Sequence, residues 1–129
     1  MSYEAVREIL FVSHGKQSGS PDQTLDRLFH KNLNMAGAPR EWRPSVFNHE
    51  NMAVRLEVMS VKEVLDLRTR PHIAYQKGKA SKKVRHFPDN PLIVCILKGT
   101  AYLIDGNRRI RYLAELGRTE VKVYVCRMI

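Results

Sequence analysis

The sequence is poor in the residues that mark several large classes of protein. Its two cysteines, Cys95 and Cys126, both lie in strand-like runs, outside any CxxC motif or His/Cys cluster. We therefore expect buried free thiols in a reducing compartment, and neither a disulfide framework nor a redox centre. The 5 histidines are scattered singly along the chain, so no metal site is predicted.

Long hydrophobic runs are also missing. No segment approaches the roughly 18 consecutive apolar residues that a transmembrane helix requires. The N-terminal stretch SYEAVREILFVSHGK carries two glutamates and lacks the apolar core of a cleavable signal peptide. These absences predict a cytoplasmic protein with no membrane partner.

Acidic residues are few relative to basic ones, and the imbalance is local. The chain holds 22 Lys and Arg against 13 Asp and Glu, a formal net charge of +9. Residues 1–50 contain six of each sign, whereas residues 51–129 contain sixteen basic and seven acidic residues. The second part is therefore the predicted anion-binding module. A basic surface favours nucleic acid or nucleotide because it neutralises phosphates and releases counterions.

The first 50 residues are predicted to form a helical arm or subdomain. Asp22 can cap a helix that carries Leu25, Leu28 and Phe29 on one face and ends near residue 34 or 37. The apolar run at residues 9–12 suits either a helix or a short strand. Residues 35–51 suit an irregular connection, in which Trp42 is interpreted as an anchor onto the core, the alternative being a stacking platform for a base.

From residue 53 the pattern changes to strands and short helices. Val54, Leu56 and Val58 alternate with charged residues and predict a half-buried strand. Ser60 and Glu63 then form a capping-box pattern for a short helix.

Continuous apolar residues follow after Pro91. The run LIVCIL predicts a strand buried on both faces, and residues 92–104 predict a hairpin. A helix with Ile110, Leu113 and Ala114 toward the sheet then ends at Gly117. A closing strand is expected to turn Val121, Val123 and Val125 inward and Lys122 and Tyr124 outward. The predicted order is β–α–loop–β–β–α–β, an α+β fold.

Residues 68–86 form the most basic segment, with seven Lys and Arg and no acidic residue. Pro71 and Gly78 argue against a long regular element, so a loop is predicted that closes over phosphates or lies along a nucleic-acid backbone. A solvated charge run is the alternative interpretation. The candidate nucleic-acid-binding residues are Arg68, Arg70, Lys77, Lys79, Lys82, Lys83 and Arg85.

The sequence DGNRR at residues 105–109 is the most informative short pattern. Asp105 and Gly106 interrupt an apolar run, and Asn107 can cap the helix that follows. The first turn of this helix carries Arg108, Arg109 and Arg111. Helix N-termini offer unpaired N–H groups and partial positive charge, so arginines there do not help the helix and point to a bound anion. Phosphate is the predicted ligand.

The residues PLIVCILKGTAYLIDGNRRIRYLAELGRTEVKVYV, with this order of elements, resemble the ParB/sulfiredoxin superfamily. The resemblance covers roughly residues 53–126 and implies a small mixed sheet flanked by helices, with residues 51–129 as the domain and a helical N-terminal extension. By similarity to ParB-like nucleotidases, Gly106, Asn107, Arg108 and Arg109 would hold nucleotide phosphates. Asn107 stands where sulfiredoxins have their catalytic cysteine, so sulfinic-acid reduction is not expected.

The superfamily also includes small-molecule kinases and ParB-like nucleases. The resemblance therefore implies ATP or CTP with Mg²⁺ as the cofactor of an enzymatic version. Such chemistry needs a carboxylate that positions metal or activates a hydroxyl. Asp105 is the first candidate and Glu57 and Glu63 are its possible partners, whereas a turn residue bonded to its own backbone is the alternative for Asp105.

Three functions remain open from the sequence. The first is a phosphate-recognising protein that binds nucleotide or nucleic acid through DGNRR and the basic segment. The second is a ParB-like nucleotidase, kinase or metal-dependent nuclease that uses Asp105. The third is a non-enzymatic interaction protein or inhibitor, of phage or plasmid type, with an acidic protein partner. We place the first ahead because two separate features, the arginine turn and the acid-free segment, point to phosphate.

Overall fold

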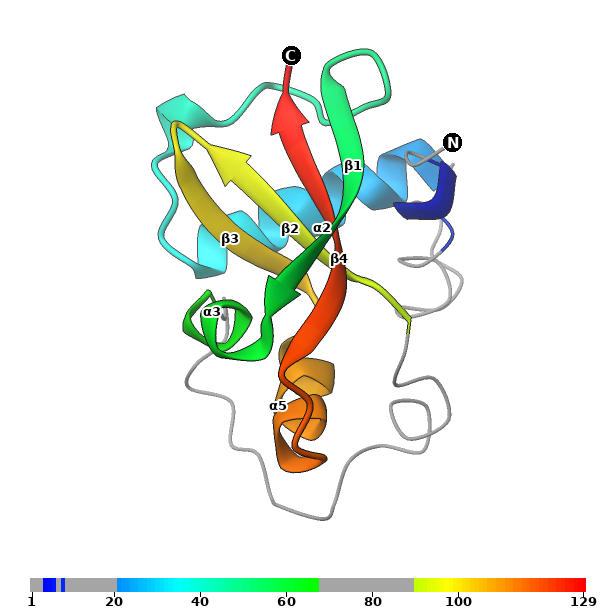
Figure 1. The fold of residues 1–129 in the computed structure, drawn as a ribbon. Coiled ribbons are helices and arrows are strands. Elements are labelled where there is room, and N and C mark those ends of the chain that lie inside the picture. The colour runs from blue at the N-terminus through cyan, green and yellow to red at the C-terminus, as the bar shows by residue number, and fades with distance from the viewer. Residues whose placement is uncertain (1–3, 7, 9–20, 68–89) are drawn as a thin grey trace.

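The protein is described by a computed structural model covering residues 4–6, 8, 21–67 and 90–129 (Figure 1). The basic segment and residues 9–12 lie outside the described residues. Residues 4–6 and 8 are helical. The remaining elements are, in order, α2 (Pro21–Met35), the 3₁₀ helix η1 (Arg40–Trp42), β1 (Met52–Ser60), α3 (Val61–Asp66), β2 (Leu92–Leu97), β3 (Thr100–Asp105), α5 (Asn107–Glu115) and β4 (Glu120–Met128).

A four-stranded sheet in the order β1-β4-β2-β3 forms the centre of the fold. β1 runs antiparallel to β4, β2 runs parallel to β4, and β2 and β3 form an antiparallel hairpin. The sheet is therefore mixed, and the predicted α+β class and the predicted order of strands and helices are confirmed, while the predicted loop lies outside the described residues. Lys98 and Gly99, with φ of 50° and 78°, make the tight hairpin turn.

Helices cover the sheet on two sides, which we call the α2 face and the α5 face. On the α2 face, Leu25, Phe29 and Leu33 join the buried cluster that includes Ile93 and Cys95. α2 therefore covers the sheet directly and shares its core; Figure 1 shows it crossing behind the strands. The other face of β2 joins a second cluster with residues of α3 and α5, so the expectation of a strand buried on both faces is confirmed.

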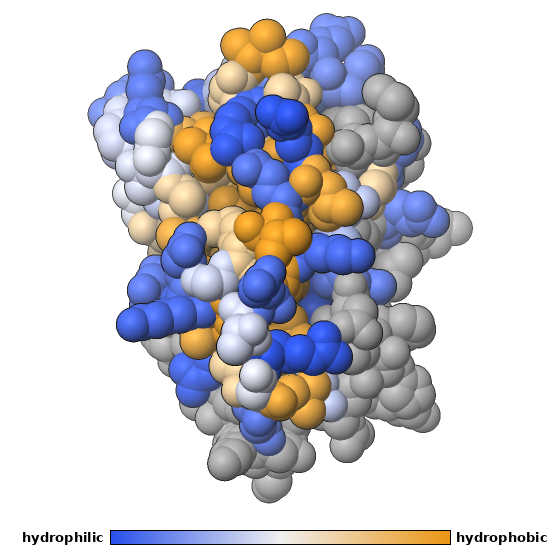
Figure 2. Space-filling view, viewed as in Figure 1, coloured by the Kyte–Doolittle hydropathy of each residue, from blue (hydrophilic) through white to orange (hydrophobic). Residues whose placement is uncertain are grey.

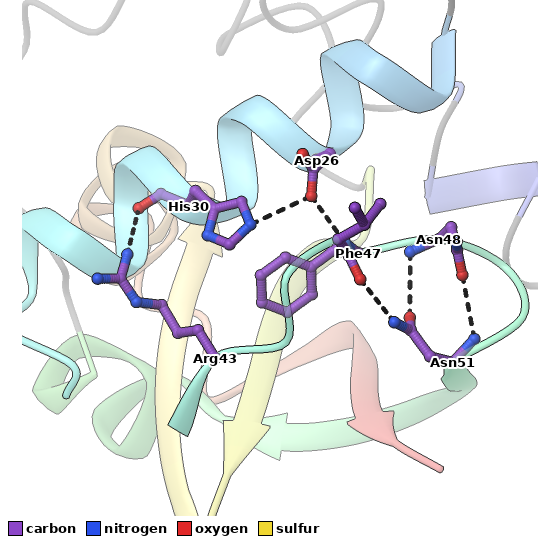
Figure 3. A network of polar contacts seen from close by, with 7 residues as sticks. Asp26, His30, Arg43, Phe47, Asn48 and Asn51 are labelled. Carbon is purple, nitrogen blue, oxygen red and sulfur yellow. Dashed lines mark hydrogen bonds and ion pairs between the residues drawn. The ribbon is translucent and has the colours of Figure 1, made fainter. Parts of the chain in front are cut away.

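The connection after α2 is held to that helix by a polar network (Figure 3). Asp26 Oδ1 accepts a hydrogen bond from the backbone N–H of Phe47 at 2.7 Å and lies 3.2 Å from Nε2 of His30. The ring of Phe47 packs against that of Phe29, with centroids 5.1 Å apart. Trp42 packs against the same α2-face cluster, as the anchoring interpretation predicts.

The predicted caps of the two short helices are present. Ser60 Oγ accepts the N–H of Glu63 at 3.0 Å at the start of α3. At the end of α5, Gly117 has φ of 78° and its N–H bonds to the carbonyl of Ala114, while Arg118 N–H bonds to that of Leu113. These are the two bonds of a Schellman motif. Ile110 and Leu113 are buried against the sheet, as predicted.

The prediction for β1 was wrong in one respect. Val54 is half-buried, but Leu56 and Val58 are 50% and 60% exposed. Their partners in the register are Tyr124 and Lys122 of β4. The alternation correctly indicates a strand. However, β1 lies at the edge of the sheet, and the described residues that cover the α2 face do not cover Leu56 and Val58.

The prediction for β4 also needs one correction. Val123 and Val125 are buried on the α5 face as expected, but Tyr124 packs against the α2-face cluster and does not point outward. Cys126 is buried on the same face, beside Cys95 in the parallel register, and both thiols are free. The expectation of buried free cysteines is confirmed. Within the described ranges, no helix is long and apolar enough to span a membrane.

Candidate phosphate-binding turn

The turn between β3 and α5 requires glycine at position 106. Gly106 has φ of 111° and ψ of 17°, a backbone conformation that side chains disfavour. A Cβ on this residue would also lie 2.5 Å from Cγ of Leu92. Gly106, and not Asn107 as predicted, is the N-cap of α5 and supplies no capping side chain. The first turn of the helix contains no acidic residue. The positive end of the helix is therefore not neutralised by a carboxylate of its own first turn.

Arg109 lies under the turn and is held by three contacts. Its Nη1 donates to the backbone carbonyls of Asn90 at 3.0 Å and Pro91 at 3.1 Å, and its Nη2 lies 3.7 Å from Oδ2 of Asp105. Arg109 is 8% exposed and Asp105 is 7% exposed. Burial lowers the pKa of Arg109, and the Asp105 carboxylate opposes that shift. A guanidinium stays protonated in proteins, so this is a buried ion pair that clamps the start of β2 to α5.

Arg108 has the opposite environment. It is exposed, whereas the next residue, Arg109, is buried. No ion pair or hydrogen bond is found for the Arg108 side chain in the part of the chain that the structure describes. Asn107 lies between these extremes, half-buried at the first position of the helix. The two arginines that were predicted together to hold phosphate therefore differ: Arg108 presents its guanidinium to solvent, and two nitrogens of Arg109 are already engaged.

The described residues on either side of the basic segment contact β3 and α5, the two elements that this turn joins. The carbonyl of Leu67, the last described residue before the segment, accepts the N–H of Leu103 in β3 at 3.1 Å. Asn90, the first described residue after it, is bonded to Arg109. The seven predicted nucleic-acid-binding residues themselves, Arg68 to Arg85, lie outside the described residues. The nearest described residues before and after them are Leu67 and Asn90.

The three candidate catalytic carboxylates are not gathered into one site. Asp105 ends β3 at one edge of the sheet, and Glu57 lies in β1 at the other edge, where it pairs with Arg127 at 3.0 Å. Glu63 is exposed on α3. Across the described ranges, no three His, Cys, Asp or Glu side chains come together in a way that would hold a metal ion. The residues do not fit a magnesium centre built on Asp105 with Glu57.

A second cationic region was missed by sequence reasoning. A surface hollow of about 510 Å³ lies beside the end of α2 and η1 and contains no acidic side chain in its lining. Nη1 of Arg43 donates to the carbonyl of His30 at 3.3 Å (Figure 3), and its buried Nε has no hydrogen-bond partner among the described residues. The lining residues are His30, Lys31, Asn34, Arg40, Arg43, Pro44 and Ser45.

The sequence contains only a weak indication of this hollow. Basic residues bracket the end of the α2 helix, but they belong to two segments that only the fold brings together. Because residues 1–50 carry no net charge, composition alone gave no reason to look there.

Comparison with known proteins gave no match: no protein-family model, no curated protein and no solved structure is significantly similar to the chain.

Proposed function

We propose that the chain binds the phosphate groups of a nucleotide or nucleic acid at the start of α5, in a ParB/sulfiredoxin-like fold. Gly106 allows the backbone to approach the ligand, the first turn of α5 supplies N–H donors, and Arg108 supplies a guanidinium that can bind two phosphate oxygens. Arg109 and Asp105 fix the geometry of the turn from below and are positioning residues.

One observation carries this proposal. The described residues that flank the acid-free basic segment, Leu67 before it and Asn90 after it, are hydrogen-bonded to β3 and to Arg109 respectively. The proposal therefore places the basic segment close to the turn. Phosphate is the ligand that suits both, because it carries several charges and several acceptor oxygens.

An enzymatic role receives no specific support from the structure. Asp105 is buried and directed at Arg109, and Glu57 and Glu63 lie elsewhere. We therefore assign Asp105 to the turn itself. ATP or CTP stays a candidate ligand for its phosphates, without an assigned reaction.

The proposal is tested by direct binding. Fluorescence anisotropy with labelled single-stranded DNA, duplex DNA and RNA would detect a nucleic-acid ligand. Thermal shift with ATP, ADP, CTP and GTP would detect a nucleotide, because a ligand that binds only the folded state raises the melting temperature. We expect at least one of these ligands to bind, and Arg108→Ala to weaken that binding about tenfold or more, as expected when one charge-assisted contact of about 1.5–3 kcal/mol is lost.

The matched control is Lys122→Ala, which removes one exposed positive charge from β4. Arg40→Ala is a second control, because it removes a cation of the hollow on the α2 side. Equal loss of binding in Arg108→Ala and Lys122→Ala would show a general charge effect and contradict the proposed site. Loss in Arg40→Ala alone would move the phosphate site to the hollow.

A further inference from the structure

The two edges of the sheet differ in how their backbone groups are satisfied. At the β3 edge, the carbonyl of Leu67 accepts the N–H of Leu103. At the β1 edge, no strand pairs with the outer side of β1 in the part of the chain described here. β1 is also long, spanning Met52–Ser60, and exposes Leu56 and Val58. Figure 2 shows hydrophobic side chains at the surface along this strand, interrupted by hydrophilic ones.

The backbone groups that point to this open edge follow from the pairing with β4. Val61 N–H bonds to the carbonyl of Thr119 at one end of the ladder, and Ile129 N–H bonds to that of Asn51 at the other. Hydrogen-bonded pairs alternate along an antiparallel ladder, and this one has no register shift. Odd-numbered residues of β1 therefore bond to β4. The residues whose N–H and C=O groups face outward are Met52, Val54, Leu56, Val58 and Ser60.

We propose that β1 pairs antiparallel with β1 of a second copy of this chain, so that two sheets join across a two-fold axis at Leu56. In such a pairing, even-numbered residues of one β1 strand bond to even-numbered residues of the other. The two-fold axis must then lie where one residue of β1 faces the same residue of the partner strand, so only a few registers are allowed. The register centred on Leu56 pairs the whole strand, from residue 52 to residue 60.

The charges of β1 select the same register. With the axis at Leu56, Arg55 lies opposite Glu57 of the partner strand, and this pair occurs twice. An axis at Arg55 would oppose two arginines, and an axis at Glu57 would oppose two glutamates, both of which are unfavourable across strands. Within the described residues Arg55 has no ion-pair partner, while Glu57 already contacts Arg127. Arg55 of the partner strand would therefore join an existing ion pair.

The apolar side chains complete the match on the opposite side of the strand. Val54 would lie across from Val58 of the second copy, and Leu56 across from itself. This pairing would cover the two residues whose exposure the core does not explain. Long edge strands with exposed apolar residues and no blocking lysine or proline are prone to such pairing.

Sedimentation velocity over a concentration series tests this inference, at about 0.15 M salt so that the net charge of +9 is screened. We expect a reversible dimer of the full chain. Leu56→Lys should be monomeric at every concentration, because it opposes two lysines on the axis. Arg55→Glu should weaken the dimer at least tenfold. An equimolar mixture of Arg55→Glu and Glu57→Arg chains should form a heterodimer, because opposite charges then face one another again.

Two controls separate the edge from the fold. Arg127→Ala removes the same intrachain ion pair as Glu57→Arg while leaving β1 unchanged, and should retain the dimer. Leu56→Lys should melt within a few degrees of the wild type, because this side chain is half exposed in the monomer. A wild type that stays monomeric throughout, a dimer that survives Leu56→Lys and Arg55→Glu, or a monomer that co-purifies with a different polypeptide along β1 would each overturn the proposal.

Discussion

The two faces of the sheet are held together by different kinds of interaction. On the α2 face, a long helix buries Leu25, Phe29 and Leu33, and one of its carboxylates, that of Asp26, accepts a backbone N–H at the surface of the core. On the α5 face, a buried ion pair between Arg109 and Asp105 fixes a glycine turn. A helix that only packs needs no buried charge. The comparison therefore indicates that the α5 face has a requirement beyond packing, which we identify with holding the proposed phosphate-binding turn in place.

The largest expected effect is at the buried ion pair. Arg109→Ala removes the ion-pair contact that Arg109 makes with the buried Asp105 carboxylate, and also leaves the carbonyls of Asn90 and Pro91 without this donor. Removing one partner of a buried pair costs about 3–5 kcal/mol. Urea denaturation should show this loss in the free energy of unfolding. A loss below about 1 kcal/mol would mean that the pair does not hold the turn, and the contrast between the faces would disappear.

The next largest effect is at Gly106. Gly106→Ala imposes a side chain on a left-handed backbone, at about 1–2 kcal/mol, and forces Leu92 to move, at about 1–3 kcal/mol more. Gly99→Ala is the matched control, since Gly99 has φ of 78° but nothing within 4 Å of the added Cβ. Chemical denaturation of both variants isolates the contact with Leu92. Equal losses would show that only the backbone conformation matters at Gly106.

On the α2 face, Asp26→Ala should cost about 1–3 kcal/mol, because the N–H of Phe47 loses its acceptor in a partly buried site. Asp26→Asn keeps an oxygen acceptor and should recover most of the loss. Thermal or urea unfolding of the two variants makes the comparison with Arg109→Ala quantitative. If Asp26→Ala costs as much as Arg109→Ala, charge is as important to the α2 face as to the α5 face.

The smallest expected effect depends on pH. Burial raises the pKa of Cys95 to about 12, and burial, with a smaller contribution from Cys95, also raises the pKa of Cys126. A folded-state pKa above the unfolded value leaves stability unchanged below about pH 9. Above that pH the unfolded thiols ionise first, so each thiol lowers stability by about 1.4 kcal/mol per pH unit. Urea denaturation from pH 8 to pH 10 should show this slope, and Cys95→Ala should reduce it. An unchanged slope would contradict the assignment.

Local patterns predicted most of the fold. The capping serine at residue 60, the glycine ending α5 and the apolar run of β2 are each contained in a few neighbouring residues, so their physical causes can be read without the tertiary structure. The exposure of Leu56 and Val58 was missed because alternation shows that a strand has two sides but not whether anything covers them. That information depends on the order of strands in the sheet.

The candidate site shows the same limit. The DGNRR turn was found because its residues are contiguous. The different environments of Arg108 and Arg109, in contrast, depend on Asn90 and Pro91, which lie 19 and 18 residues before Arg109 in the chain. The hollow beside α2 was missed because its cations come from two segments and add no net charge to that half of the sequence. The basic segment was recognised by composition alone.

The salt dependence of binding tests the central claim most directly. If Arg108 contacts a phosphate, the slope of log affinity against log salt for duplex DNA or RNA should fall in magnitude by about 0.9, the share of one phosphate contact, in Arg108→Ala. Lys122→Ala should keep the wild-type slope. An identical slope in wild type and Arg108→Ala would contradict a phosphate site at the start of α5. So would affinities that do not change with salt concentration for any of the nucleotides and nucleic acids tested.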